Sequence, residues 1–311
     1  PKLAEETRLQ IEQAVRNMGY MSGQVSMHTQ VKGKKIKVGY QIHSGEPYLI
    51  SHVAYDIADY QIHDYLMADS ARSYLKSGSR LDVNRLDQER DRITQYLQNR
   101  GYYRLNKDFI TYQVDTMRNS RNVDLIMKLH PYRRRKEDPP SPHRQYYVRN
   151  VDFMFDVDFA ELTSGRLKGI DSLRSGGVNF FYKDKLFLRP QVISDYNYLK
   201  SGNLYRTRDV QSTYSALGRL NILKYSNIRF REELEADSAY LDAYVMLTRN
   251  KNKSLSFEIE GTNSAGDLGA AASVAYSHRN LFKGSETFTF KLRGAYEAVT
   301  GLEGYANSNY L

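Results

Sequence analysis

The pentapeptide YLKSG occurs twice in the chain, at Tyr74–Gly78 and at Tyr198–Gly202. Such an identity is either accidental or marks the same point in two copies of a structural unit. A repeated unit would determine the fold, because each copy must then form the same elements in the same order. The sequence around the two pentapeptides therefore decides the fold class.

The residues after the first pentapeptide predict a helix and two strands. Asp82 or Asn84 can cap a helix, and Leu86 and Ile93 share one helix face. Gly101 stands where a left-handed residue ends a helix. Apolar and polar residues then alternate in "FITYQVDT" and "NVDLIMKLH", which predicts two half-buried antiparallel strands.

The same order of elements follows the second pentapeptide. The segment "RDVQSTYSALGRLNILKY" predicts a helix closed by Tyr225, and "NIRFREEL" and "YLDAYVMLT" predict two strands. A further copy at the front, "TRLQIEQAVRNMGY", begins inside its helix and is followed by two alternating strands. Its first part would precede residue 1, so we expect the natural chain to extend N-terminally.

The two copies that contain the pentapeptide also have a strand and a helix ahead of it, as in "YLISHVAYDI" and "YYVRNVDFMF". The repeated unit is therefore β-α-α-β-β. We expect five parts: the C-terminal part of a module at 1–46 (the first copy), a module at 47–133 (the middle copy), a proline-stiffened linker at 134–145, a module at 146–250 with an insertion near 156–188 (the last copy), and further strands at 251–311. We expect the insertion to contact a partner protein, because long excursions in compact modules usually have a role.

Composition excludes several classes of site. The net charge is +9, with the basic residues dispersed, and the chain has no cysteine, so it forms no disulfide and no thiolate zinc site. The acidic residues Asp152, Asp156, Asp158 and Glu161 lack the glycine-punctuated spacing of a calcium loop and are interpreted as loop charges. No catalytic motif is present, so we expect no enzyme activity, no metal, no cofactor and no small-molecule substrate.

A tandem β-α-α-β-β unit whose second helix ends in "GY" resembles the POTRA domain. The whole chain, and most specifically residues 240–297, resembles the TamA/BamA-like surface antigens of Bacteroidetes type in the Omp85 superfamily. The resemblance implies an α+β fold of tandem POTRA modules followed by the start of an antiparallel transmembrane β-barrel. The alternation in "SLSFEIE" and "ETFTFKLRGAY" supports strands with one lipid-facing side.

The resemblance implies a factor for outer-membrane protein assembly or translocation, with residues 1–250 in the periplasm. Its partners would be unfolded outer-membrane proteins, assembly-complex proteins or other periplasmic proteins, received by strand addition at sheet edges, with no nucleic acid. The predicted edge strands are 24–31, 109–115 and 228–233. The residues predicted to bind there are Gln24, Val25, Ser26, Met27, His28, Phe109, Ile110, Thr111, Tyr112, Gln113, Ile228, Arg229, Phe230 and Arg231. Two alternatives stay open: a two-partner-secretion transporter of the same superfamily, and a soluble basic array that binds nucleic acid.

Overall fold

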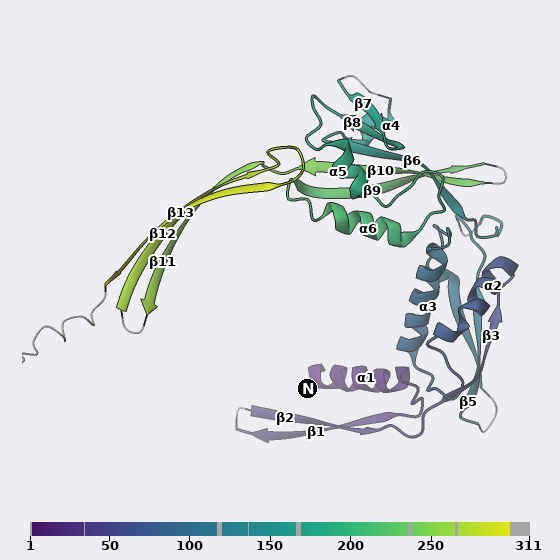
Figure 1. Cartoon of the computed structure of the whole chain (residues 1–311). Helices are drawn as coiled ribbons and strands as arrows, with labels where there is room; N and C mark the ends of the chain where they lie inside the picture. Colours follow the sequence, from purple (N-terminus) through teal and green to yellow (C-terminus); the bar gives the residue numbers. More distant parts are fainter. Residues whose placement is uncertain are drawn as a thin grey trace, which may run out of the picture. The chain divides into compact units, whose positions relative to one another are not determined.

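The computed structural model of the chain describes residues 2–33, 35–116, 120–135, 137–165, 169–235, 238–264 and 267–298. Parts of the predicted ranges, at 117–119, 136, 166–168, 236–237, 265–266 and 299–311, lie outside the described residues. The chain divides into two compact units, residues 1–146 with 205–207 and residues 147–204 with 208–311. The described residues form helices and four mostly antiparallel or mixed sheets (Figure 1), which confirms the α+β class. No described helix is long and apolar enough to cross a membrane. The finer division into five parts stays a prediction.

The first copy consists of one helix and a hairpin. Helix α1 (Lys2–Asn17) is followed by β1 (Gln24–Lys32) and β2 (Lys35–His43), which pair antiparallel. Gly19 ends the helix with φ of +92°, and Gly101 ends the corresponding helix of the middle copy with φ of +95°. These matching left-handed residues are the ones that the repeat predicts.

The middle copy has its two main helices over one face of a three-stranded sheet. Its elements are β3 (Leu49–Asp56), α2 (Tyr60–Ala68), the 3₁₀ turn η1 (Ser70–Arg72), α3 (Val83–Gln98), the 3₁₀ turn η2 (Lys107–Phe109), β4 (Ile110–Thr116) and β5 (Asn122–Leu129). The strand order is β3-β5-β4, with β3 parallel and β4 antiparallel to β5. Fully buried residues of α2, α3 and the sheet form its core, among them Ile62, Ile93, Leu97 and Met127.

The last copy has a larger sheet than the sequence predicts. Its elements are β6 (Tyr146–Phe155), α4 (Phe159–Thr163), β7 (Asp171–Ser175), β8 (Val178–Tyr182), α5 (Pro190–Asp195), α6 (Thr207–Leu217), β9 (Leu223–Leu234) and β10 (Ala239–Arg249). The strand order is β7-β8-β6-β10-β9. The insertion is therefore not only an excursion, because its two strands extend the sheet of its own module.

The helix before β9 is also shorter than predicted. Helix α6 ends at Leu217, and Tyr225, predicted to close it, lies in β9. Gly218 follows the last helical residue, and its N–H donates to the carbonyl of Tyr214. Glycine has the weakest helix propensity apart from proline, so the helix stops there and the chain reaches the sheet earlier.

The two YLKSG segments form the same joint. The N–H of Gly78 donates to the carbonyl of Ile50 at 2.7 Å, and that of Gly202 donates to the carbonyl of Val148 at 2.7 Å. The glycines have φ of +78° and +84°, and the serine hydroxyl before each glycine donates to the next carbonyl along the strand. In both copies the joint thus binds the first half of the module's first strand, so the repeat is structural.

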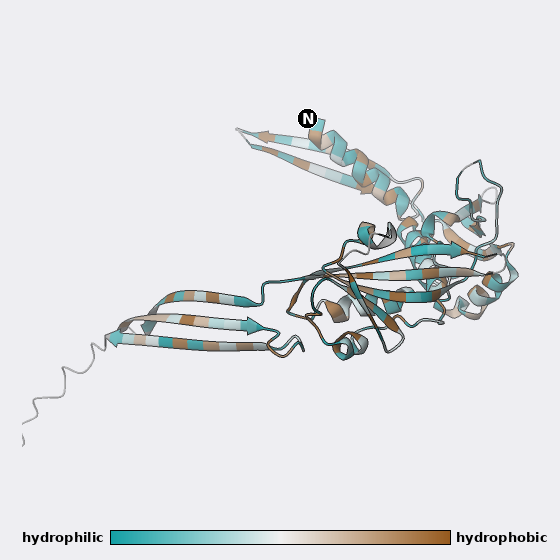
Figure 2. Cartoon of the chain, turned by 90° about the horizontal axis from the view of Figure 1, so that it is seen from above, coloured by the Kyte–Doolittle hydropathy of each residue, from teal (hydrophilic) through white to brown (hydrophobic). Residues whose placement is uncertain are grey.

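The last three strands form a separate antiparallel sheet with two different faces. These are β11 (Lys253–Ser264), β12 (Asp267–Arg279) and β13 (Thr287–Ala298), in the order β11-β12-β13. Apolar and polar residues alternate along them (Figure 2). One face presents exposed apolar side chains, among them Phe257 at 73%, Ile259 at 87% and Leu292 at 67%. The other carries ion pairs that join β11 and β13 across β12, such as Glu258–Lys291 at 2.8 Å.

Candidate polypeptide-binding edges

Strand β4 lies at the free edge of the middle sheet. Its inner side pairs with β5, with Thr111 opposite Lys128 and Gln113 opposite Ile126. Ile110 is fully buried, while Thr111 and Gln113 are exposed. Tyr112 is half-buried; burial raises the pKa of its phenol, so the side chain stays neutral. Among the described residues no other strand covers the outer side of β4, so the edge can accept an added strand.

Phe109 does not belong to this strand. The residue ends η2, whose N-cap is Asn106, with the side-chain oxygen of Asn106 accepting from the N–H of Asp108 at 2.8 Å. The Phe109 ring packs edge-on against His143 at 5.0 Å between ring centroids. A side-chain cap therefore turns the backbone before the strand starts, and the edge begins at Ile110 rather than at Phe109.

Strand β9 is the edge of the last sheet, but part of it is occupied. The N–H of Ile228 donates to the hydroxyl of Tyr214 at 2.7 Å, and this hydroxyl donates to the side chain of Asn227. Phe230 is half-buried and Arg229 is exposed. A strand that adds to β9 would have to displace the Tyr214 hydroxyl or do without a hydrogen bond to the N–H of Ile228. Strand β9 is therefore a less accessible edge than β4.

Charge distinguishes β9 further. Arg231, on β9, and Arg149, on β6, both donate to the carboxylate of Asp242, at 3.2 and 2.7 Å. Asp242 is 2% exposed, and its pKa is lowered because these hydrogen bonds outweigh the effect of burial. Arg231 is thus held by a buried partner in its own module, and it positions the sheet rather than offering a free cation.

In the part of the chain that the structure describes, strand β1 pairs with one strand, β2, with Gln24 opposite His43. Val25 is buried, and its carbonyl accepts a hydrogen bond from Arg8 of α1 at 3.1 Å. The remaining residues predicted to bind here alternate in exposure along the strand: Ser26 and His28 are exposed, and Met27 is half-buried. Helix α1 therefore fixes the start of β1 and leaves the later positions open.

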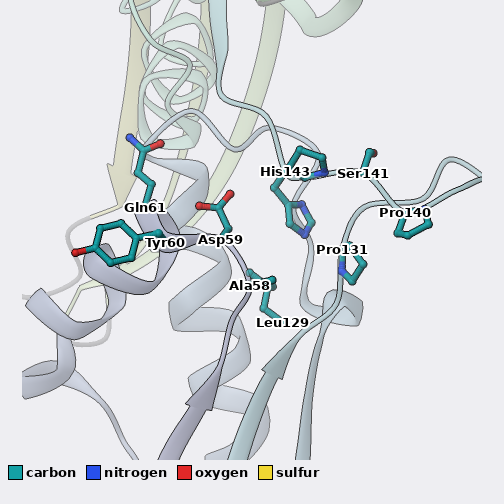
Figure 3. Close-up of a pocket in the computed structure, with 10 residues that line it drawn as sticks. Ala58, Asp59, Tyr60, Gln61, Leu129, Pro131, Pro140, Ser141 and His143 are labelled. Atoms are coloured by element: carbon teal, nitrogen blue, oxygen red, sulfur yellow. The ribbon is translucent and has the colours of Figure 1, made fainter.

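The described part of the chain contains a largely apolar pocket of about 680 Å³ that sequence reasoning did not find (Figure 3). It lies at the ends of β3 and β5 and is closed by the proline-rich segment, in which Tyr132 and Ser141 exchange two backbone hydrogen bonds of 2.9 Å. The pocket is lined by Ala58, Asp59, Tyr60, Gln61, Leu129, Pro131, Pro140, Ser141, Pro142 and His143. The only advance signal was the proline cluster, which predicted stiffness but not concavity.

Two polar side chains of this pocket form hydrogen bonds within the module. The Asp59 carboxylate caps α2 by accepting from the N–H of Ile62 at 3.1 Å. His143 is 9% exposed, and its Nε2 lies 2.9 Å from the carbonyl of His130, to which it donates. Burial lowers the pKa of His143, which keeps the ring neutral near pH 7. The pocket can hold an apolar side chain, and it offers no nucleophile paired with a base.

The acidic residues near the insertion each have a structural partner. Asp152 accepts from the side chain of Asn179 at 2.7 Å, and Glu161 pairs with Lys183 at 2.7 Å. Asp156 accepts from the backbone N–H of Arg249. No group of three or more potential ligands in the described residues could hold a metal ion.

We compared the sequence and the structure of the chain with those of known proteins. No protein-family model and no curated protein sequence matches the chain. Among solved structures, BamA from Haemophilus ducreyi lacking POTRA domains 1–3 is similar over 80% of this chain, with 15% identity and a TM-score of 0.51. The chain has the POTRA fold.

Two further structures are similar at lower scores. POTRA domains 3–5 of BamA from Haemophilus influenzae match 78% of the chain at 13% identity, with a TM-score of 0.42. CdiB from Acinetobacter baumannii matches 95% of the chain at 9% identity, with a TM-score of 0.35. The chain spans 37%, 79% and 47% of the lengths of the three structures in the order given.

Proposed function

We propose that the chain is the periplasmic POTRA array and the first barrel strands of an outer-membrane protein assembly factor. In this proposal the POTRA modules bind extended client or partner polypeptides by strand addition and pass them to an Omp85 barrel. The observation that carries it is the open edge of β4 in a module of POTRA fold. Its backbone groups can pair with any extended chain, which suits a receptor for many clients.

The sheet β11-β12-β13 supports the membrane part of the proposal. Its apolar side chains pair across strands, with Phe257 opposite Val274 and Val274 opposite Leu292. A face of this kind is costly in water, and strands with one apolar and one charged side suit a lipid exterior and a wet interior. The charged pairs Glu258–Lys291 and Glu260–Arg293 lie on the other side.

Binding of unfolded proteins to the full chain tests this function. We would compare an unfolded outer-membrane β-barrel protein with an unfolded cytosolic protein, using the chain and its Gln113→Pro variant, which alters the β4 backbone. The matched control is Gln113→Ala, which keeps the N–H. Selective binding of the barrel protein that the proline reduces at least tenfold, and the alanine does not, is the expected result.

Site-specific cross-linking provides a second measurement that does not depend on a proline. Because the chain has no cysteine, Gln113→Cys places a single thiol on the β4 edge, and Gln88→Cys places one on the exposed face of α3. A client with one cysteine should cross-link at position 113 and not at 88. Equal cross-linking at both positions, or none at 113, would refute strand addition at β4.

A further inference from the structure

The middle and last copies differ at the edge formed by their first strand. The joint aligns β3 with β6, because Ile50 and Val148 hold equivalent hydrogen bonds to the two pentapeptide glycines. Counting on from these residues, two apolar residues of β3 and Ile57, which directly follows the strand, match three apolar residues of β6. The matched pairs are Val53 with Val151, Tyr55 with Phe153, and Ile57 with Phe155.

In the last copy this edge is covered by the module's own strand. Strand β8 pairs with β6 in parallel, with Asp152 opposite Asn179 and Phe155 opposite Tyr182. The Phe180 ring lies 6.0 Å from that of Phe153 between centroids. Val151, Phe153 and Phe155 are consequently at most 2% exposed.

In the middle copy the corresponding positions are only partly covered. The joint binds the first half of β3, through Ile50 and Ser51. Beyond that point β3 is the edge of its sheet, and no other described strand pairs with its outer side. Val53, Tyr55 and Ile57 are half-buried, although their counterparts are fully buried. The middle copy thus has the same apolar edge that β8 covers in the last copy, and no described strand covers it.

We propose that residues 53–57, which are the second half of β3 and the residue after it, bind an extended segment of a partner polypeptide in parallel orientation. The segment would place apolar or aromatic side chains at alternate positions over Tyr55 and Ile57, as β8 does over Phe153 and Phe155. This interaction goes beyond the proposed client binding, because it uses the opposite edge of the sheet from β4, and it does not require a membrane.

The chemistry favours a polypeptide from another protein as the occupant. Unpaired N–H and C=O groups along a strand are satisfied in register only by another backbone. The half-buried stripe adds an apolar contribution, since covering it removes aromatic and aliphatic surface from water. The β8 strand of a second copy is not available, because Phe180 is fully buried in its own module.

The test uses the full chain and a synthetic peptide with the sequence of residues 178–188, VNFFYKDKLFL, as the probe. Ala54 matches Asp152, which lies opposite Asn179, so the proposed register places the peptide's Asn position opposite Ala54. With a mild oxidant added to accept the two electrons, a peptide with cysteine at that position should form a disulfide with Ala54→Cys, because opposite residues of paired strands are within disulfide reach. The control thiols are Gln113→Cys on β4 and Gln88→Cys on α3.

A disulfide that forms at least tenfold faster with Ala54→Cys than with either control supports the proposal. Equal rates at all three positions, or reaction at position 113 alone, overturn it, and reaction at 113 alone would leave the proposed client binding intact. A peptide with its cysteine shifted by one residue should react slowly with Ala54→Cys, because the two thiols then point to opposite faces.

A gain of affinity provides an independent readout without a covalent bond. Ala54→Asp introduces a carboxylate at the position of Asp152, which accepts from Asn179 at 2.7 Å in the last copy. We expect about threefold tighter binding of the peptide by fluorescence anisotropy, as one added hydrogen bond provides. The gain should vanish when the peptide's asparagine is replaced by alanine. An equal gain for both peptides would overturn the proposed register.

Discussion

Removing the buried carboxylate of Glu89 should destabilise the middle copy much more than the equivalent change in the last copy. Glu89 is 1% exposed, and its carboxylate accepts from the N–H of Tyr74 at 2.9 Å. The same carboxylate pairs with Arg92 at 2.7 Å. Arg92 also pairs with Asp69 and is 15% exposed in its side chain. Glu89→Ala therefore leaves one N–H and part of a guanidinium without a partner.

The last copy supplies the control. There the N–H of Tyr198 donates to the hydroxyl of Thr213 at 3.1 Å, in the same place relative to the joint. Thr213→Ala removes this neutral hydrogen bond and the one that the hydroxyl donates to the carbonyl of Asp209 at 2.8 Å, which at the lower end of the range for neutral hydrogen bonds are together worth about 1 kcal/mol. Breaking a buried ion pair costs about 3–5 kcal/mol, and since Arg92 keeps Asp69 we expect about 3 kcal/mol for Glu89→Ala. The difference of about 2 kcal/mol corresponds to about a 30-fold difference in the opening equilibrium.

Hydrogen exchange followed by mass spectrometry resolves the two copies within one chain, because each peptide reports its local opening free energy. Peptides from α3 should exchange faster by about two orders of magnitude in Glu89→Ala, and peptides from α6 by less than tenfold in Thr213→Ala. Glu89→Gln, which keeps an acceptor for Tyr74, should fall between. If exchange rates rose equally in Glu89→Ala and Thr213→Ala, this expectation would be refuted. Such a result would mean that removing the buried carboxylate does not destabilise Arg92.

Three further changes have distinct expected outcomes. Gly19→Ala should destabilise the first copy by more than about 2 kcal/mol in urea unfolding. The glycine has φ of +92°, and an added Cβ would lie 2.2 Å from the carbonyl oxygen of Leu81. The control Gly33→Ala, at a glycine with φ of +61° and open space around it, should cost only about 1 kcal/mol. Because the pKa of His143 is lowered in the folded chain, the unfolded chain binds the proton more tightly. The free energy of unfolding should therefore fall as pH drops below about 6.5 and stop falling below the folded-state pKa. A His143→Gln variant whose thermal unfolding has the same pH dependence as the original chain would contradict this. Phe180→Ala should cost about 3–5 kcal/mol, because the ring is fully buried between aromatic neighbours; a loss below 1 kcal/mol in the unfolding of the last copy would show that β8 does not contribute to its core.

Sequence reasoning predicts the repeated unit because its signals are local. The turn in YLKSG needs a left-handed residue, and glycine stands there in both copies. The alternation in β4 and β5 fixes which side chains are buried, so Ile110 and Met127 face the helices. The sequence predicts an end of α6 that is too late, because apolar spacing continues past Gly218 into β9 and does not show where a helix becomes a strand.

The strands of the insertion could not be predicted by the same reasoning. Strand β7 is short and polar, "DSLRS", and its residues are exposed or half-buried, so it has no alternation to detect. Its pairing depends on β8, which in turn depends on the aromatic surface of β6. Non-local pairing of this kind leaves little trace in one segment, as does the Tyr214 hydroxyl that occupies an N–H of β9.

The three POTRA-fold sheets differ in how much of each edge is available, and this difference limits where an added strand can bind. The first half of β3 and of β6 is bound by the joint, the second half of β6 by β8, and one N–H of β9 by Tyr214. Strand β4 and the second half of β3 have no such cover in the described residues. Because both belong to the middle sheet, that sheet can gain a strand on each side and reach five strands, the number that the last sheet attains with its own hairpin. A protein that occupies one of these edges leaves the other accessible, so the two proposals together predict that a dedicated partner at β3 and a transient client at β4 bind the same module at the same time.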